Sequence, residues 1–260
     1  MKWKTKYYLC LIPSLLGVLI FYILPFIRVL YYSVLNNQFE MKFIGFENYL
    51  NTITNSYFKL ALKNSFSLIL ICVPIVIILA IFLSIIINKL NNTGRILSSL
   101  FIIPIVIPTA AIVSVWHNLF DNVDSAIVIY LLFIWKNLGI CIILISAAVN
   151  AVPKQIYEAA ELDGAGNIKE HLYITLPCIF PSILFSILLM IVYSFKIYKE
   201  SYLYYGTNYP PEHSYTLQYY MDNHFMKLDY QALSSGAVIN TIIILFIVVI
   251  MLKIQRKYTL

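Results

Sequence analysis

Six apolar runs, each of about twenty residues or more, constrain the fold of this chain more than any other feature. They cover about residues 7–32, 65–88, 96–116, 126–149, 177–198 and 233–254. A helix of roughly twenty residues, rising 1.5 Å per residue, crosses the ~30 Å hydrocarbon core of a bilayer. Only helices and closed barrels satisfy their own backbone hydrogen bonds there. We therefore expect an all-α, polytopic membrane protein with six transmembrane helices, forming one domain over residues 1–260.

The composition supports a membrane protein and narrows its class. Hydrophobic residues make up 61% of the chain and charged residues only 12%, whereas soluble proteins carry roughly 25% charged residues. Prolines inside four of the six runs predict bent or broken helices. No Asp or Glu lies inside any run, which argues against a secondary transporter, since such proteins use intramembrane carboxylates for coupling.

The distribution of Lys and Arg predicts the orientation in the membrane. One set of connections is rich in basic residues: Lys2, Lys4, Lys6, Lys89, Arg95, Lys154, Lys169, Lys253, Arg256 and Lys257. The other set has fewer: Lys42, Lys59, Lys63, Lys199 and Lys227. Because cytoplasmic loops carry the excess of positive charge, we expect both termini and residues 151–176 on the cytoplasmic side. Residues 33–62, 117–125 and 199–232 are then external.

The 151–176 connection contains the longest polar run with helical character. Pro153 suits the first turn of a helix, and Gly164 and Gly166 supply the freedom for a turn. A second short helix is expected over 167–176, where Pro177 ends it or opens the next element. The sequence thus predicts a helix, a glycine turn and another helix between two membrane spans.

This run resembles the EAA loop of binding-protein-dependent ABC importer permeases. The matching pieces are Glu158-Ala159-Ala160, Asp163-Gly164-Ala165 and Ile174-Thr175-Leu176-Pro177. The last two pieces resemble the sugar permeases of the maltose and glycerol-phosphate type. Residues 43–65 and 211–232 are similar to that family's two outer loops. The chain departs from the family pattern at His171, where Phe is usual, and at the 117–125 connection, which is shorter than usual.

The resemblance implies a type I ABC importer permease fold and a transport function without covalent chemistry. It implies that the chain carries a sugar or oligosaccharide across the bacterial cytoplasmic membrane. The implied partners are a second, non-identical permease chain, two cytoplasmic ATPase subunits, an external solute-binding protein and the lipid bilayer. Since the chain has no Walker A motif, we expect no cofactor in it, with ATP bound by the ATPase subunits. The residues implied to couple to the ATPase are Glu158, Ala159, Ala160, Asp163, Gly164, Ala165, Leu176 and Pro177.

Three residues are candidates for the solute pathway: Lys136, Asn137 and Tyr193. Lys136 lies about ten residues into the fourth run, where a charge costs about 2.5–3.5 kcal/mol on insertion scales. It should therefore face a cavity or a partner, or else reach the interface as a structural anchor. Tyrosines of the fifth run and the segment after it predict an interfacial belt: Tyr193, Tyr198, Tyr202, Tyr204 and Tyr205.

Other functions have weaker support in the sequence. The histidines lack metal-ligand spacing, and Asp121 and Asp124 are expected in a solvated turn, so we expect neither a metal site nor a catalytic residue. Nucleic-acid binding is not expected, because the basic residues are scattered between apolar runs. The alternatives left open are an importer of glycerol phosphate, a polyamine or a peptide and, in another class, an intramembrane enzyme.

Overall fold

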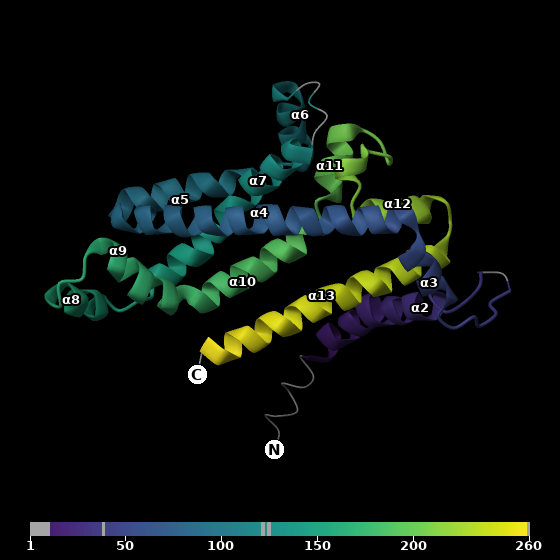
Figure 1. Ribbon diagram of the computed structural model, residues 1–260, viewed down its shortest axis with the longest axis horizontal. Coiled ribbons are helices and arrows are strands. Elements are labelled where there is room, and N and C mark those ends of the chain that lie inside the picture. Colours follow the sequence, from purple (N-terminus) through teal and green to yellow (C-terminus); the bar gives the residue numbers. More distant parts are fainter. Residues whose placement is uncertain (1–10, 38–39, 121–122, 124–125, 259–260) are drawn as a thin grey trace, which may run out of the picture. The chain divides into compact units, whose positions relative to one another are not determined.

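The computed structural model describes residues 11–37, 40–120, 123 and 126–258 (Figure 1). Over these ranges the fold is helical, and the one isolated β-bridge pairs Leu35 with Phe43. The chain divides into two compact units. The terminal unit comprises Met1–Lys59 and Tyr220–Ile243, and the central unit comprises Leu60–Tyr219 and Ile244–Leu260.

The terminal unit begins with a helical run from Leu11 to Tyr32. This run contains a π-helical turn, η1 (Leu19–Ile23), followed by α2 (Leu24–Tyr32). After it come the short helix α3 (Glu47–Thr54) and the first residues of α4 (Ser56–Lys89). The unit also takes the end of α12 (Leu217–Met226) and the first half of α13 (Tyr230–Tyr258).

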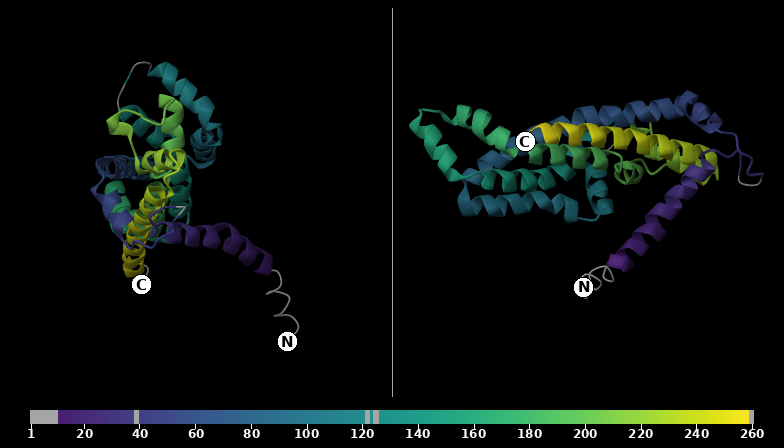
Figure 2. Two further views of the ribbon diagram at one scale, coloured as in Figure 1. Left: turned by 90° about the vertical axis from the view of Figure 1, so that its right-hand side faces the viewer. Right: turned by 90° about the horizontal axis from the view of Figure 1, so that it is seen from below.

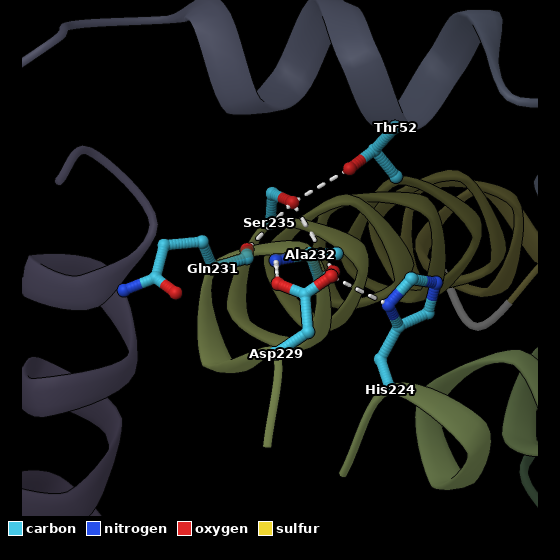
Figure 3. A network of polar contacts seen from close by, with 6 residues as sticks. All are labelled: Thr52, His224, Asp229, Gln231, Ala232 and Ser235. Atoms are coloured by element: carbon cyan, nitrogen blue, oxygen red, sulfur yellow. Dashed lines mark hydrogen bonds and ion pairs between the residues drawn. The ribbon is translucent and has the colours of Figure 1, made fainter. Parts of the chain in front are cut away.

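Polar contacts at the start of α13 hold the terminal unit together (Figure 3). The Oδ1 atom of Asp229 accepts a hydrogen bond of 3.1 Å from the backbone N–H of Ala232, in the manner of an N-cap. Its Oδ2 atom lies 2.9 Å from Nδ1 of His224. One turn further on, the hydroxyls of Ser235 and Thr52 are 2.6 Å apart, which ties α3 to α13.

The central unit has α7 (Ala126–Asn150) packed against α5 (Asn91–Val106) and α10 (Leu176–Ser194) (Figures 1 and 2). Side chains of α4, α7 and α10 supply most of its buried core. The remaining elements are α6 (Thr109–Leu119), α8 (Lys154–Leu162), α9 (Asn167–Glu170), η2 (His171–Thr175), α11 (Tyr198–Tyr205) and η3 (Glu212–Ser214).

Five helices of the described residues are long and apolar enough to cross a membrane. The run expected at 96–116 becomes a sixth span only if α5 and α6 are taken together, because they meet at 94°. Ile107 between them is extended, with φ −66° and ψ 137°. The ring of the following Pro108 disfavours helical geometry at Ile107 and so ends α5. The break at Pro108 confirms the expectation of a broken helix in this run. Pro74, Pro104 and Pro181 lie inside α4, α5 and α10.

Pro177 opens the next element, one of the two outcomes expected from the sequence, because it lies in the first turn of α10. The short helix before it is not separated from α10. Helical structure continues from Asn167 to Ser194 through the π-helical turn η2. The N–H of Leu176 bonds to His171 O, and the N–H of Leu24 bonds in the same way to Leu19 O before Pro25. These wider i→i−5 turns accommodate proline because its ring would clash with the carbonyl of residue i−4 in a regular α-helix.

Candidate coupling loop and polar pocket

A glycine turn closes α8 as the sequence predicted. Gly164 has φ +78°, a left-handed conformation that glycine adopts without strain. Its N–H bonds to Glu161 O at 3.0 Å, and the N–H of Ala165 bonds to Ala160 O at 2.9 Å. These two bonds form a Schellman motif, which satisfies the last carbonyls of α8 and starts α9 at a defined angle.

The turn between α8 and α9 exposes acidic and apolar side chains together. Glu158, Glu161 and Asp163 are all exposed. Leu162 is 90% exposed, Tyr173 77% and Ile168 75%. Glu158 and Asp163 were predicted from the sequence as part of this loop, whereas these exposed apolar side chains were not. Exposed apolar side chains beside charged ones are typical of a protein-binding surface.

The base of the loop is fixed to the central unit by polar contacts. Thr175 is fully buried, and its Oγ1 lies 3.1 Å from the hydroxyl of Tyr157 and 3.1 Å from Nδ1 of His171. Lys89 Nζ at the end of α4 donates to Asn167 Oδ1 at 3.4 Å. His171, which departs from the family pattern, therefore makes a side-chain hydrogen bond just before α10 begins.

The three residues expected on the solute pathway come together at one cavity of about 260 Å³. Lys136 and Asn137 reach it from α7 and Tyr193 from α10. Ile105, Phe133, Lys196, Ile197 and Glu200 complete its lining. The Asn137 amide also donates to Phe133 O at 2.8 Å, which holds that side chain in place.

Lys136 forms an ion pair with Glu200 and donates to Thr109 Oγ1 at 3.2 Å. The side chains of the pair are only 14% and 10% exposed, so each charge depends on the other for compensation. Glu200 and Thr109 were not predicted from the sequence as partners of Lys136. The available signal was the position of Glu200 in the first turn of the helix that follows the fifth run.

The tyrosines of α11 do not all lie at an exposed belt. Tyr204 is buried, and its hydroxyl donates to Phe120 O at 3.1 Å. Tyr198 packs edge-on against the buried Tyr219, with ring centroids 4.7 Å apart. Aromatic packing after the fifth span therefore builds part of the core rather than only an interfacial surface.

No group of three or more His, Cys, Asp or Glu among the described residues could hold a metal ion. His117 packs against Tyr204, with ring centroids 5.5 Å apart. Asp121 and Asp124 lie outside the described residues.

Comparisons with known proteins agree along almost the whole chain. The family model described as "Binding-protein-dependent transport system inner membrane component" matches residues 64–258. The arabinooligosaccharides transport system permease protein AraP of Bacillus subtilis is 28% identical, over 96% of this chain and 87% of that protein. The trehalose/maltose transport system permease protein MalF of Thermococcus litoralis is 22% identical, over 97% of this chain and 96% of that protein.

The fold matches a solved transporter. A chain of the bacterial alginate ABC transporter, solved in complex with an alginate pentasaccharide-bound periplasmic protein, superposes with a TM-score of 0.83. The match covers 99% of this chain and 96% of that chain at 20% identity. With the family model matching residues 64–258, this chain belongs to the inner membrane components of binding-protein-dependent transport systems.

Proposed function

We propose that this chain is a membrane-spanning subunit of an ATP-driven importer that carries a sugar or oligosaccharide across the bacterial cytoplasmic membrane. The observation that carries the proposal is the glycine-closed loop α8–α9, placed directly before a core helix in a chain of this family. The relatives named for arabinooligosaccharides and for trehalose/maltose support a saccharide as the solute.

The loop is the proposed seat of a cytoplasmic ATPase subunit. Its exposed Glu158 and Asp163 would meet basic groups, and the exposed Leu162 would fill an apolar recess on that partner. Because α9, η2 and α10 form one helical run, a displacement of the loop would pass into α10 and on to α7. Alternating access then follows from repacking of these helices.

The remaining partners follow the same scheme. A second, non-identical permease chain would complete the pathway, with a second ATPase subunit beneath it. An external solute-binding protein would dock on residues 33–62 and 199–232. The cavity lined by Lys136, Asn137 and Tyr193 is the proposed polar section of the pathway, since amide, ammonium and phenol groups form hydrogen bonds with sugar hydroxyls.

Substitution of Gly164 tests the coupling role. Gly164→Pro forces φ to about −65° and removes the N–H that bonds to Glu161 O. We expect this variant to stay in the membrane but to lose solute uptake and copurification of the ATPase. Gly164→Asn is the matched control, because Asn tolerates the left-handed conformation and an added Cβ meets no atom within 4 Å. It should retain most of the uptake.

The result that contradicts the proposal is normal uptake by a Gly164→Pro variant present at wild-type level in the membrane. Wild-type copurification of the ATPase with Gly164→Pro would also contradict it, because the turn of the loop would then not be needed for docking.

A further inference from the structure

Helix α3 of the terminal unit has three chemically different sides. Its residues are Glu47-Asn48-Tyr49-Leu50-Asn51-Thr52-Ile53-Thr54. In a helix with 3.6 residues per turn, residues spaced i, i+4 and i+7 share one side. Here such spacing separates an inward polar side, an outward apolar side and an outward polar side.

The inward side is polar and hydrogen-bonded to its own unit. The Asn48 amide donates to Ser33 O at 3.0 Å and to Leu35 O at 2.7 Å. The Tyr49 hydroxyl lies 2.6 Å from Ser33 Oγ, and Thr52 pairs with Ser235 (Figure 3). These contacts fix the rotation of α3 about its axis, so its other two sides must point outward.

The second side is an apolar stripe that faces out. Phe46, Leu50 and Ile53 recur at i, i+4 and i+7, and they are 76%, 64% and 50% exposed. Phe43 before the helix and Tyr57 after it are exposed as well. In a helix of a soluble protein the apolar stripe faces the core. In α3 the arrangement is the reverse, because the polar side faces the protein and the apolar stripe faces outward.

The third side consists of Glu47, Asn51 and Thr54, all exposed. It lies next to the apolar stripe and runs the full length of the helix. A helix with protein on one side, an apolar stripe on the second and polar groups on the third matches a membrane–water boundary. At such a boundary the apolar face enters the acyl region while the polar face stays in water.

Connections to neighbouring helices place α3 at the ends of membrane spans. It follows α2, which ends at Tyr32, and directly precedes α4, which begins at Ser56. The Thr52–Ser235 contact binds it to the first turns of α13. All three helices belong to candidate membrane spans. Lys59, exposed in the first turn of α4, is suited to meet lipid phosphates at the same level.

We propose that α3 lies in the membrane–water interface with its axis along the membrane surface. Phe46, Leu50 and Ile53 dip among the lipid chains, and Glu47, Asn51 and Thr54 face water. The occupant of the apolar stripe is lipid. The solute-binding protein proposed to dock on residues 33–62 would meet only the water-facing side of this segment. The lipid contact itself does not depend on the solute or on the coupling role of the α8–α9 loop.

Site-directed spin labelling tests this placement. Single nitroxide labels at Leu50 or at Asn51 are introduced into the full-length chain after its cysteines are replaced. The chain, with the partners that copurify with it, is reconstituted in phosphatidylglycerol–phosphatidylcholine vesicles. Oxygen, which concentrates in lipid, and a water-soluble nickel chelate then serve as relaxation agents. Ile53 and Glu47 form a second matched pair, because all four side chains are exposed.

We expect the oxygen-to-nickel collision ratio at Leu50 and Ile53 to exceed that at Asn51 and Glu47 severalfold. Equal ratios at the two members of each pair would place α3 in water and overturn the proposal. Low collision rates with both agents at Leu50 and Ile53 would mean that a protein covers the stripe. That outcome would also overturn it and would point to a partner interface. A loss of uptake through the Gly164→Pro variant bears on coupling alone, so the two proposals fail independently.

Discussion

Gly139 shows how one residue sets the distance between two helices of the central unit. A Cβ placed on Gly139 in α7 would lie 1.8 Å from the backbone oxygen of Phe101 in α5. The two backbones therefore meet directly, and the contact is with main-chain atoms that cannot rotate away. Small residues permit this kind of close approach between membrane helices.

Gly139→Ala is expected to destabilise the chain by about 1–3 kcal/mol, as overpacking of a core does. Thermal unfolding of the purified chain in mild detergent measures this as a lower midpoint temperature. Gly17→Ala is the matched control, since a Cβ there meets no atom within 4 Å. Equal midpoints for the two variants would contradict the close approach of α5 and α7.

Asp229 has two bonding roles at the start of α13, and they respond differently to substitution. Its hydrogen bond with His224 lowers the pKa of its carboxyl below the ordinary 3.8, and the bond from Ala232 acts in the same direction. A carboxyl with a depressed folded pKa stabilises the fold above its unfolded pKa, and this stability is lost as the pH falls through the folded value.

Asp229→Ala removes the cap and is expected to cost about 1 kcal/mol of stability. Asp229→Asn keeps an oxygen for the Ala232 N–H but loses the charge, so its deficit should be smaller at neutral pH. The deficit of Asp229→Asn should then shrink as the pH falls from 3.8, where the carboxyl of the unfolded chain is protonated, through the lower pKa of the folded carboxyl. Unfolding midpoints of the three proteins, measured across pH, check this. A deficit of Asp229→Asn that grows on acidification would contradict it.

The ion pair between α7 and α11 makes two elements of the central unit depend on each other. Lys136 and Glu200 are 64 residues apart in sequence and both largely buried. Breaking a buried pair leaves one charge without compensation, which costs about 3–5 kcal/mol, whereas removing both charges is often much cheaper.

A double-mutant cycle with Lys136→Met and Glu200→Gln tests this dependence. Each single variant should unfold at a clearly lower temperature than the wild type, and the double variant should recover part of the loss. In the single variants, uptake should fall in proportion to the amount of folded protein. In a stable double variant, any further loss of uptake would show that the pair has a role in the pathway. Strict additivity of the two substitutions would show that the pair is not coupled.

At the scale of the whole molecule, two helices leave most of their apolar surface uncovered. In the apolar 18-residue stretch of Leu11–Tyr32, no residue is buried within the chain. In the corresponding stretch of Tyr230–Lys257, 6% of the residues are buried. The corresponding shares are 33% for α4 and 44% for α7. In a membrane such surfaces meet lipid or other subunits, which supports the proposal that the chain completes its pathway only in a complex.

A pull-down of the tagged chain in gentle detergent is expected to recover a Walker-motif ATPase and a second, different permease with its own EAA loop. Mass spectrometry of the bound fraction identifies the partners and their stoichiometry. Recovery of the chain alone, in a detergent that preserves other importers of this kind, would contradict the proposed assembly.

The sequence alone was sufficient for features that depend on neighbouring residues. In lipid only helices and closed barrels satisfy their own backbone hydrogen bonds. Runs of about twenty apolar residues have the length of a spanning helix, whereas a barrel strand needs only about 9–11 residues. Gly164 permits a tight turn whatever the rest of the chain does, because the backbone freedom of a glycine is a local property. The motif from Glu158 to Pro177 likewise predicted the family, and the match over residues 64–258 confirms it.

Only the tertiary structure decided which distant groups meet. The prolines predicted a break in the 96–116 run, but the 94° angle between α5 and α6 could not be derived from local patterns. The same holds for the choice of Glu200 as partner of Lys136 and for the outward-facing apolar side of α3. The continuation of the helix through Pro177 also depends on a π-helical turn that no residue type requires. Helix formation depends on residues within about a turn of one another, whereas these features depend on packing between segments far apart in sequence.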